Sequence, residues 1–352
     1  MQDASHYIAK PRNRSGKREG LVRVGPLSGI ADVTRELGVN PEEIFEDFDF
    51  TAARIEDTDF EIPYVTAGQL LARCAKATHC PHFGLLVGIR ACPSTLGIPG
   101  FLLQNASNVG AALRDLIQNL DLHDQGGAPI LDIQRNFTLL GYAIHQANVE
   151  GVEQIYDLSI AVGCNIMRRL CGGEWSPSEV RLSRRPPPDL NPYRQFHRAP
   201  LRFNADRNAL MFPNHWLNHR IPSADALLHR HLEKEASELR MRRQTDITGD
   251  TRRLLSTAIM TGNCTANDIA EQLCLHERTL HRRLREEGSS FRLELDAVRY
   301  AVARQLLVGS AMPVAAIAET LHYSGACAFI RAFKRWAGAT PARWRAKNTV
   351  FS

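Results

Sequence analysis

The chain has 352 residues, of which 44% are hydrophobic and 23% charged, a composition typical of folded proteins and enough for two or three domains. No stretch approaches the roughly 18 uncharged apolar residues of a membrane-spanning helix. The net charge of +5 is unevenly distributed, because 15 of the 43 Lys and Arg but only 10 of the 38 Asp and Glu follow residue 244, which leaves 28 of each before it. A basic C-terminal third joined to a larger neutral part favours a polyanion binder with a separate control domain.

The first 20 residues are polar and basic and lack the apolar core of a secretory signal, so we expect a flexible basic tail. An alternative that the sequence leaves open is contact between this tail and DNA phosphates. The cations that would make it are Lys10, Arg12, Arg14, Lys17 and Arg18.

The eight cysteines are scattered, with no CxxC pair and no Cys/His spacing suited to zinc. Without an export signal they are expected to be reduced thiols of a cytoplasmic protein. The pairs His229/His231 and His215/His219 are interpreted as surface residues: the first pair faces different sides of a helix, and the second has no acidic or thiol partner nearby. The sequence therefore predicts no metal site and no cofactor.

Residues 27–125 are predicted to be mostly helical. Pro41 starts one helix and is followed by acidic residues that suit the positive end of the helix dipole. Ser107 is expected to cap another helix. The inward face of that helix carries Val109, Leu113, Leu116, Ile117 and Leu120.

His123 and Asp124 could form half of a catalytic dyad, but the sequence places no nucleophile beside them, and they are interpreted as a polar helix end. The chain also lacks the GxxxxGK[ST], GxGxxG and GxSxG motifs. We therefore expect no catalytic site.

β-Structure is expected next. Apolar runs at 129–133 and 137–144 flank the polar residues 134–136, which predicts a β-hairpin. A helix is predicted over 152–171, ended by Gly172. The remaining predicted elements are short strands at 179–182 and 209–212 and a charged helix at 223–243. The very polar segment 240–246 marks the expected domain boundary.

The last third contains an internal repeat. The pattern I-A-E-x-L at 269–273 recurs at 317–321, and each copy is followed by a turn and a second helix. Aligning Leu280 with Phe329 requires an offset of 49 rather than 48, so one extra residue belongs to the second turn. The pattern predicts two helix-turn-helix units, at about 266–287 and about 314–337.

Each unit divides into an inward apolar face and an outward face. Thr265 and Asp268 form a capping-box pattern, and Pro313 opens the second unit. The predicted structural core is Ile269, Leu273, Leu280, Leu284, Ile317, Leu321, Phe329, Phe333 and Pro341. The predicted DNA-facing residues are Arg278, His281, Arg282 and Arg285 of the first unit and Ala326, Cys327, Arg331 and Lys334 of the second.

A helix at 291–307, with apolar residues at helical spacing, is predicted to join the two units. Such a helix spans roughly 25 Å. Because successive major grooves on one face of DNA lie about 34 Å apart, one chain could read two adjacent grooves. We therefore expect an α+β N-terminal domain joined to an all-α C-terminal domain with two helix-turn-helix units bridged by a long helix.

The segment 328–345 resembles the signature F-x-R-x-F-[KR]-x-x-x-G-x-[ST]-P-x-x-[WY]-R of the AraC/XylS family of bacterial regulators, and residues 277–284 match its first unit. The N-terminal part resembles the arabinose-regulator-type effector domain of the ornithine-utilisation-regulator branch. The matching pieces are Leu27-Ser28-Gly29, Leu37-Gly38, Phe83-Gly84-Leu85 and Leu96 to Phe101. The sequence departs from the family at Cys274 and His322, where Gly is usual, and at His276, where Ser is usual.

The resemblance implies an effector-binding or dimerisation domain over 21–240 and a DNA-binding domain over 248–346. It implies promoter DNA, RNA polymerase, an unknown small-molecule effector and a second copy of the chain as partners, and no membrane. By position in the motif, Arg285 and Lys334 would meet phosphate and the other outward residues would reach bases. Two further functions remain as alternatives: an enzyme with a DNA-binding appendage, and an architectural protein that binds DNA without sequence preference.

Overall fold

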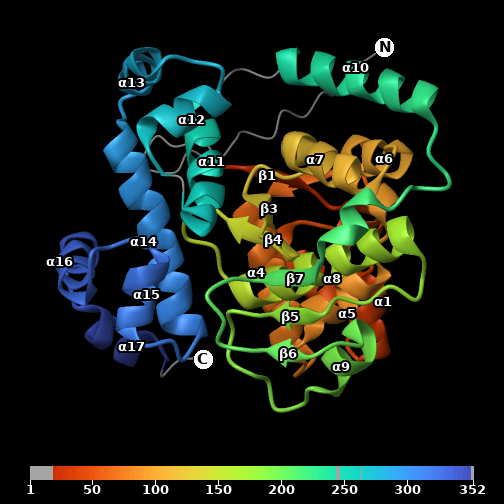
Figure 1. Cartoon of the computed structure of the whole chain (residues 1–352). Helices are drawn as coiled ribbons and strands as arrows, with labels where there is room; N and C mark the ends of the chain where they lie inside the picture. The colour runs from red at the N-terminus through yellow and green to blue at the C-terminus, as the bar shows by residue number, and fades with distance from the viewer. Residues whose placement is uncertain (1–18, 243–245, 263, 350–352) are drawn as a thin grey trace, which may run out of the picture.

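The computed structural model describes residues 19–242, 246–262 and 264–349 (Figure 1). The predicted basic tail therefore lies almost entirely outside the described residues, as does part of the predicted boundary segment. Within the described ranges, no helix is both long enough and apolar enough to cross a membrane. The chain forms an α+β N-terminal part and an all-helical part after residue 246, which confirms the expected fold class.

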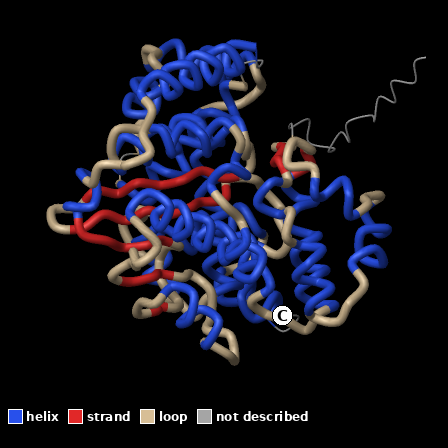
Figure 2. Tube along the Cα trace, turned by 90° about the vertical axis from the view of Figure 1, so that its right-hand side faces the viewer, coloured by secondary structure: helices blue, strands red, loops and turns tan. Residues whose placement is uncertain are grey.

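A five-stranded sheet lies at the centre of the N-terminal part, with strand order β3-β4-β7-β5-β6 (Figure 2). The predicted hairpin is confirmed: β3 (Gly127–Ile133) pairs with β4 (Phe137–Ile144) in antiparallel register, Gly127 opposite Ile144. The other strands are β5 (Glu179–Arg181), β6 (Leu201–Arg202) and β7 (Ala209–Pro213). Only the β5–β6 pair is parallel.

The long helix α8 (Val152–Cys171) packs against β4 and β7 on one side and against α5 (Phe83–Arg90) on the other. Glycines of α5 allow this approach, because a Cβ on Gly84 or Gly88 would collide with the backbone of α8. Two short strands, β1 (Leu21–Arg23) and β2 (Glu61–Pro63), form a separate antiparallel pair. The remaining helices before α8 are α1 (Ile30–Glu36), α2 (Pro41–Phe45), α3 (Ala52–Glu56), α4 (Tyr64–Ala77), α6 (Ile98–Asn105) and α7 (Val109–Asn119), and α9 (Asn191–His197) follows it.

The cap of α7 corrects one prediction. Asn108, not Ser107, is the N-cap, and its Oδ1 accepts a hydrogen bond of 2.9 Å from the Ala111 backbone N–H. The backbone of Asn108 is extended, as an N-cap requires, and its side chain satisfies a donor that the first helical turn leaves free. Ser107 lies one residue too early to reach it.

The helical C-terminal part has its own core. Its elements are α11 (Ile247–Thr261), α12 (Ala266–Gln272), α13 (Glu277–Glu286), α14 (Phe291–Gly309), α15 (Val314–Thr320), α16 (Ala326–Ala337) and α17 (Pro341–Thr349). Helix α14 connects the two helix pairs, which project from its two ends in Figure 1. The predicted bridging helix is therefore confirmed and runs two residues longer than expected.

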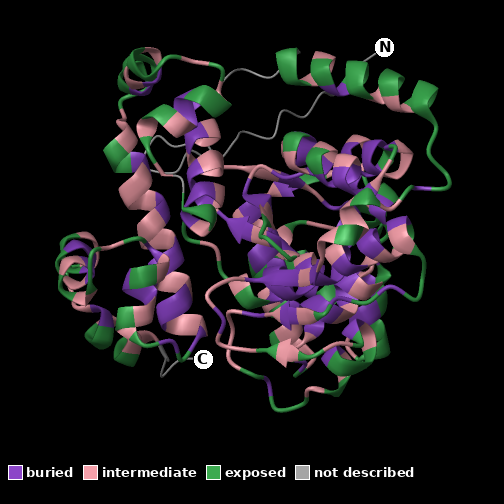
Figure 3. Ribbon diagram, viewed as in Figure 1, coloured by how far each residue is buried: buried purple, intermediate pink, exposed green. Residues whose placement is uncertain are grey.

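The helices on either side of residue 246 both pack on the N-terminal part. Helix α10 (Ala226–Arg242) lies across α6, where Leu232, Ala236 and Leu239 pack on Leu102 and Leu122. Helix α11 packs directly against the hairpin strand β3. Most residues of α10 are exposed, as the green segments of its ribbon in Figure 3 show.

Candidate functional sites

The first recognition helix, α13, is held in place by the capped helix α12 and by its own buried leucines. In α12 the Thr265 side chain accepts from the Asp268 N–H, and the Asp268 carboxylate accepts from the Thr265 N–H, which is the predicted capping box. Leu280 and Leu284 of α13 are fully buried. His276 precedes α13 and makes no side-chain cap hydrogen bond, consistent with the weaker capping ability of His.

The outward face of α13 carries a shallow basic hollow lined by Glu277, Arg278, His281, Arg282 and Arg285. The three arginines are exposed and His281 is half-buried. The structure thus gathers the four residues predicted from the first unit on one surface.

Two acidic residues that the sequence analysis did not place belong to this face. Arg282 Nη1 donates to Glu286 Oε1 at 2.8 Å, and His281 Nε2 lies 3.4 Å from Glu277 Oε1. Both pairs have i,i+4 spacing, a signal that was available in the sequence. Exposed pairs of this kind contribute about 0–1 kcal/mol, so a phosphate or base could displace the acidic partner.

The second recognition helix, α16, presents a less basic surface. Cys327, Arg331 and Lys334 are exposed and Ala326 is half-buried. Phe329 and Phe333 are fully buried and Trp336 packs beside them, so the inner stripe is aromatic rather than aliphatic.

The turns of the two units are related but unequal. Four residues separate α12 from α13 and five separate α15 from α16, as the repeat offset predicted. Cys274 and His322 occupy equivalent positions, and both have left-handed backbone, with φ of 52° and 55°. Glycine adopts this conformation without a steric penalty, which explains why it is usual at these positions in the AraC/XylS family that the sequence resembles.

The bridging helix is fixed to α11 by a buried ion pair. Glu294 of α14 is 1% exposed and pairs with Arg252 of α11, and it also accepts a hydrogen bond from Ser289. At about 1.5 Å per residue, the 19 residues of α14 extend over about 28 Å. The two outward faces are therefore held apart by a rigid helix.

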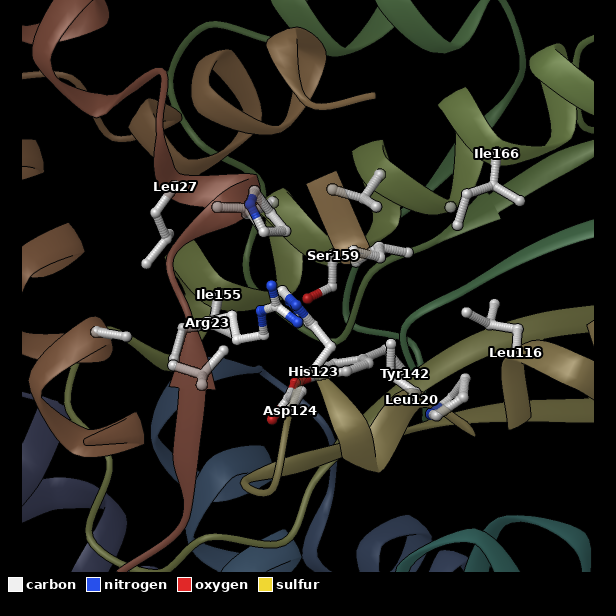
Figure 4. A pocket seen from close by; sticks show the side chains of 18 of the residues that line it. Arg23, Leu27, Leu116, Leu120, His123, Asp124, Tyr142, Ile155, Ser159 and Ile166 are labelled. Atoms are coloured by element: carbon white, nitrogen blue, oxygen red, sulfur yellow. The ribbon is translucent and has the colours of Figure 1, made fainter. Parts of the chain in front are cut away.

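A cavity of about 100 Å³ lies within the N-terminal part, between β1, α4, α7, β3, β4 and α8 (Figure 4). Most of its wall is aliphatic. The apolar side chains that line it include Leu27, Leu71, Leu96, Leu116, Leu120, Leu140, Ile155, Leu158, Val162 and Ile166.

Asp124 and Tyr142 form a closed hydrogen-bond network at the edge of this cavity. Asp124 Oδ1 accepts from the N–H groups of Gly126 and Gly127 at 2.8 and 3.0 Å, and Oδ2 accepts from the Tyr142 hydroxyl. Tyr64 Oη lies 2.9 Å from Tyr142 Oη. Burial raises the pKa of Asp124 to about 6, although the three hydrogen bonds act in the opposite direction.

Arg23, His123 and Ser159 supply the other polar groups of the wall and point toward the middle of the view in Figure 4. Burial, with the nearby Arg23 charge, lowers the pKa of His123 to about 3, so its imidazole is neutral at neutral pH. The interpretation of His123 and Asp124 as a polar helix end was incomplete. They do follow a short helical turn (Leu120–Leu122), but both are only 5% exposed and line the cavity.

A second polar cluster links α10 to α7. His229 Nε2 is 2.8 Å from Asp115 Oδ2 and its Nδ1 is 3.7 Å from Glu233 Oε2. One ligand atom from each of the three residues falls within 4.8 Å of the others. His229 is thus half-buried and hydrogen-bonded rather than a free surface histidine, and the cluster ties α10 to the domain.

The fold and these sites define a DNA-binding protein with two helix-turn-helix units and a separate ligand-binding domain. A family model described as the arabinose-binding domain of AraC transcription regulator, N-terminal, matches residues 38–221, and a helix-turn-helix domain model matches residues 269–347. The chain belongs to the AraC family of transcriptional regulators. The departures at Cys274, His276 and His322 leave its second domain within that family.

Two of the relatives match along nearly the whole chain. The HTH-type transcriptional regulator VirS of Mycobacterium tuberculosis is 28% identical over 344 residues, covering 94% of this chain and 98% of VirS. The ornithine utilization regulator of Pseudomonas aeruginosa is 23% identical over 92% of this chain and 96% of its own length. The crystal structure of the transcriptional regulator CdpR from Pseudomonas aeruginosa aligns with 90% of this chain and 98% of CdpR, at 22% identity and a TM-score of 0.43.

Proposed function

We propose that this regulator reads two successive major grooves of promoter DNA with α13 and α16, in the bacterial cytoplasm. The observation that carries the proposal is the pair of outward-facing recognition helices at the two ends of one rigid helix, α14. Binding alone accounts for the activity, and no catalytic step is involved.

The two recognition helices have different parts in this proposal. Arg278, His281 and Arg282 reach base edges from α13, while Arg285 meets phosphate. Ala326, Cys327 and Arg331 face bases from α16, and Lys334 meets phosphate. Because α13 offers more hydrogen-bond donors than α16, the first unit contributes more of the discrimination between base pairs.

The N-terminal domain controls this binding through a small-molecule effector that binds in its cavity. Strand β3 contributes Pro129 to the cavity wall and also packs against α11 of the DNA-binding part. A ligand that moves this strand would therefore bias the position of the first helix-turn-helix unit. A coupling free energy of about 1–3 kcal/mol is typical of such control. The same domain would also join two copies of the chain, and the DNA-bound protein would contact RNA polymerase, as the family implies.

The test of DNA reading compares two arginines of α13. Arg282→Ala should weaken binding to the operator by about 1–3 kcal/mol and relax the preference at one base position, because Arg282 lies opposite the buried Leu280 and Leu284. The control is Arg283→Ala, which removes the same charge from the same helix, outside the basic hollow. Fluorescence anisotropy on operator and random DNA measures both affinities. Equal losses on the two DNAs would mean that Arg282 contacts phosphate, and unchanged affinities would remove it from the interface.

A further inference from the structure

We propose that the cavity binds a small apolar monocarboxylate. This proposal rests on the effector control proposed above. The cavity is lined mostly by aliphatic side chains, so the body of the ligand must be largely apolar to gain from burial. Its polar wall is confined to a few residues, and those residues decide the chemistry of the ligand's head group.

The available polar groups suit an anion. Arg23 lines the cavity, and its Nε is buried without a hydrogen-bond partner among the described residues. The other end of its guanidinium pairs with Asp59, whose side chain is 78% exposed and therefore already well solvated. A carboxylate inside the cavity would meet an arginine whose ion-pair partner, Asp59, lies at the surface.

His123 and Ser159 add neutral groups beside that charge. The His123 side chain is buried, and its Nδ1 has no partner among the described residues. Ser159 Oγ reaches the same wall from α8. A carboxylate can accept from the guanidinium and the serine hydroxyl together, and from the Nδ1–H tautomer of the neutral imidazole.

The same wall disfavours a cation and a sugar. Asp124 is the buried acid that could hold an ammonium group, but both of its oxygens are already occupied by Gly126, Gly127 and Tyr142. A pentose would bury several hydroxyl groups against aliphatic side chains, and each unsatisfied hydroxyl costs about 1–3 kcal/mol. The ligand therefore differs from arabinose, although the domain matches an arabinose-binding family.

The test uses the full chain and ligands that differ only in the head group. Hexanoate, hexan-1-ol and hexylamine are titrated by calorimetry together with L-arabinose, and the acid series runs from butanoate to decanoate. We expect the preferred acid to bind about tenfold or more tightly than its alcohol, since hydrogen bonds to charged groups are worth roughly twice neutral ones. The amine and arabinose should bind far more weakly.

Two variants assign the preference to Arg23. Arg23→Gln should abolish the preference for acid over alcohol while alcohol binding persists, which also demonstrates an intact cavity. Arg35→Gln is the control, because Arg35 forms an exposed pair with Asp32 in the same domain but outside the cavity. Tighter binding of the alcohol, amine or arabinose, or no binding of any acid in the series, would overturn the ligand class.

A separate measurement keeps this inference distinct from the proposed function. DNA affinity is measured by anisotropy with and without the preferred acid. If the acid binds through Arg23 but leaves DNA affinity unchanged, the ligand class stands and effector control is wrong. If no acid binds while DNA reading by α13 is intact, the ligand class alone fails.

Discussion

Cys274 and His322 hold equivalent left-handed positions in two turns, but their side chains differ in what they contribute. The Cys274 side chain is exposed. The His322 Nε2 lies 2.8 Å from the Ile259 carbonyl oxygen, to which it donates. A left-handed non-glycine residue costs about 1–2 kcal/mol, so this hydrogen bond offsets part of the strain in the second turn. Among the described residues, no hydrogen bond of the Cys274 side chain offsets the strain in the first.

Replacing these residues by glycine should therefore stabilise the first turn but not the second. Cys274→Gly should raise the free energy of unfolding of the C-terminal part by about 0.5–1 kcal/mol, since relief of strain exceeds the added flexibility of the unfolded chain. His322→Gly should give no gain, because it also loses the bond to Ile259. Urea unfolding of the two variants measures the difference. A gain from both substitutions would show that the His322 hydrogen bond contributes nothing.

At the scale of the element, α16 depends on an aromatic cluster. The Phe333 ring lies 5.7 Å from Tyr300, 5.8 Å from Phe329 and 5.9 Å from Trp344, measured between ring centroids. These residues come from α14, α16 and α17. The cluster therefore fixes the second recognition helix to the bridging helix. This attachment is needed for the outward faces of α13 and α16 to stay at a constant distance from each other.

Removing the central ring should loosen the second unit. Phe333→Ala is expected to cost roughly 3–5 kcal/mol, as for a fully buried aromatic side chain. Leu293→Ala on α14 is the control, because Leu293 is 60% exposed. Differential scanning calorimetry of the full chain reports the melting of the C-terminal part. An unchanged midpoint for Phe333→Ala would mean that the inward face of α16 is wrongly assigned.

At the scale of the whole molecule, specific polar contacts accompany the packing of α11 on β3. Tyr156 Oη of α8 donates to Gln305 Oε1 of α14 at 2.8 Å. The Arg185 N–H donates to the Gly309 carbonyl at 2.8 Å, and the Ala311 N–H donates to Asn204 Oδ1 at 2.8 Å. The bridging helix thus touches the ligand-binding domain directly, and this docking would carry a signal from the cavity.

A double-mutant cycle tests the docking. Tyr156→Phe and Gln305→Ala remove the two ends of one hydrogen bond, and each should weaken domain docking by about 0.5–1.5 kcal/mol. The double variant should be little worse than either single variant, because both remove the same interaction. Hydrogen exchange at β3 and α11 measures docking, with about tenfold faster exchange for a loss of 1.4 kcal/mol. Fully additive effects would show that the two side chains do not interact in solution.

The sequence by itself determined the DNA-binding part. Helical periodicity, the capping pattern at Thr265 and the repeat are local signals, and local hydrogen bonds with i,i+4 packing decide such helices. The same rules could have found the pairs Glu277–His281 and Arg282–Glu286. The tertiary structure alone decided the cavity, because its polar wall joins Arg23, His123 and Ser159 from β1, a loop and α8. No local pattern encodes such an approach, which results from burying the apolar faces of distant elements together.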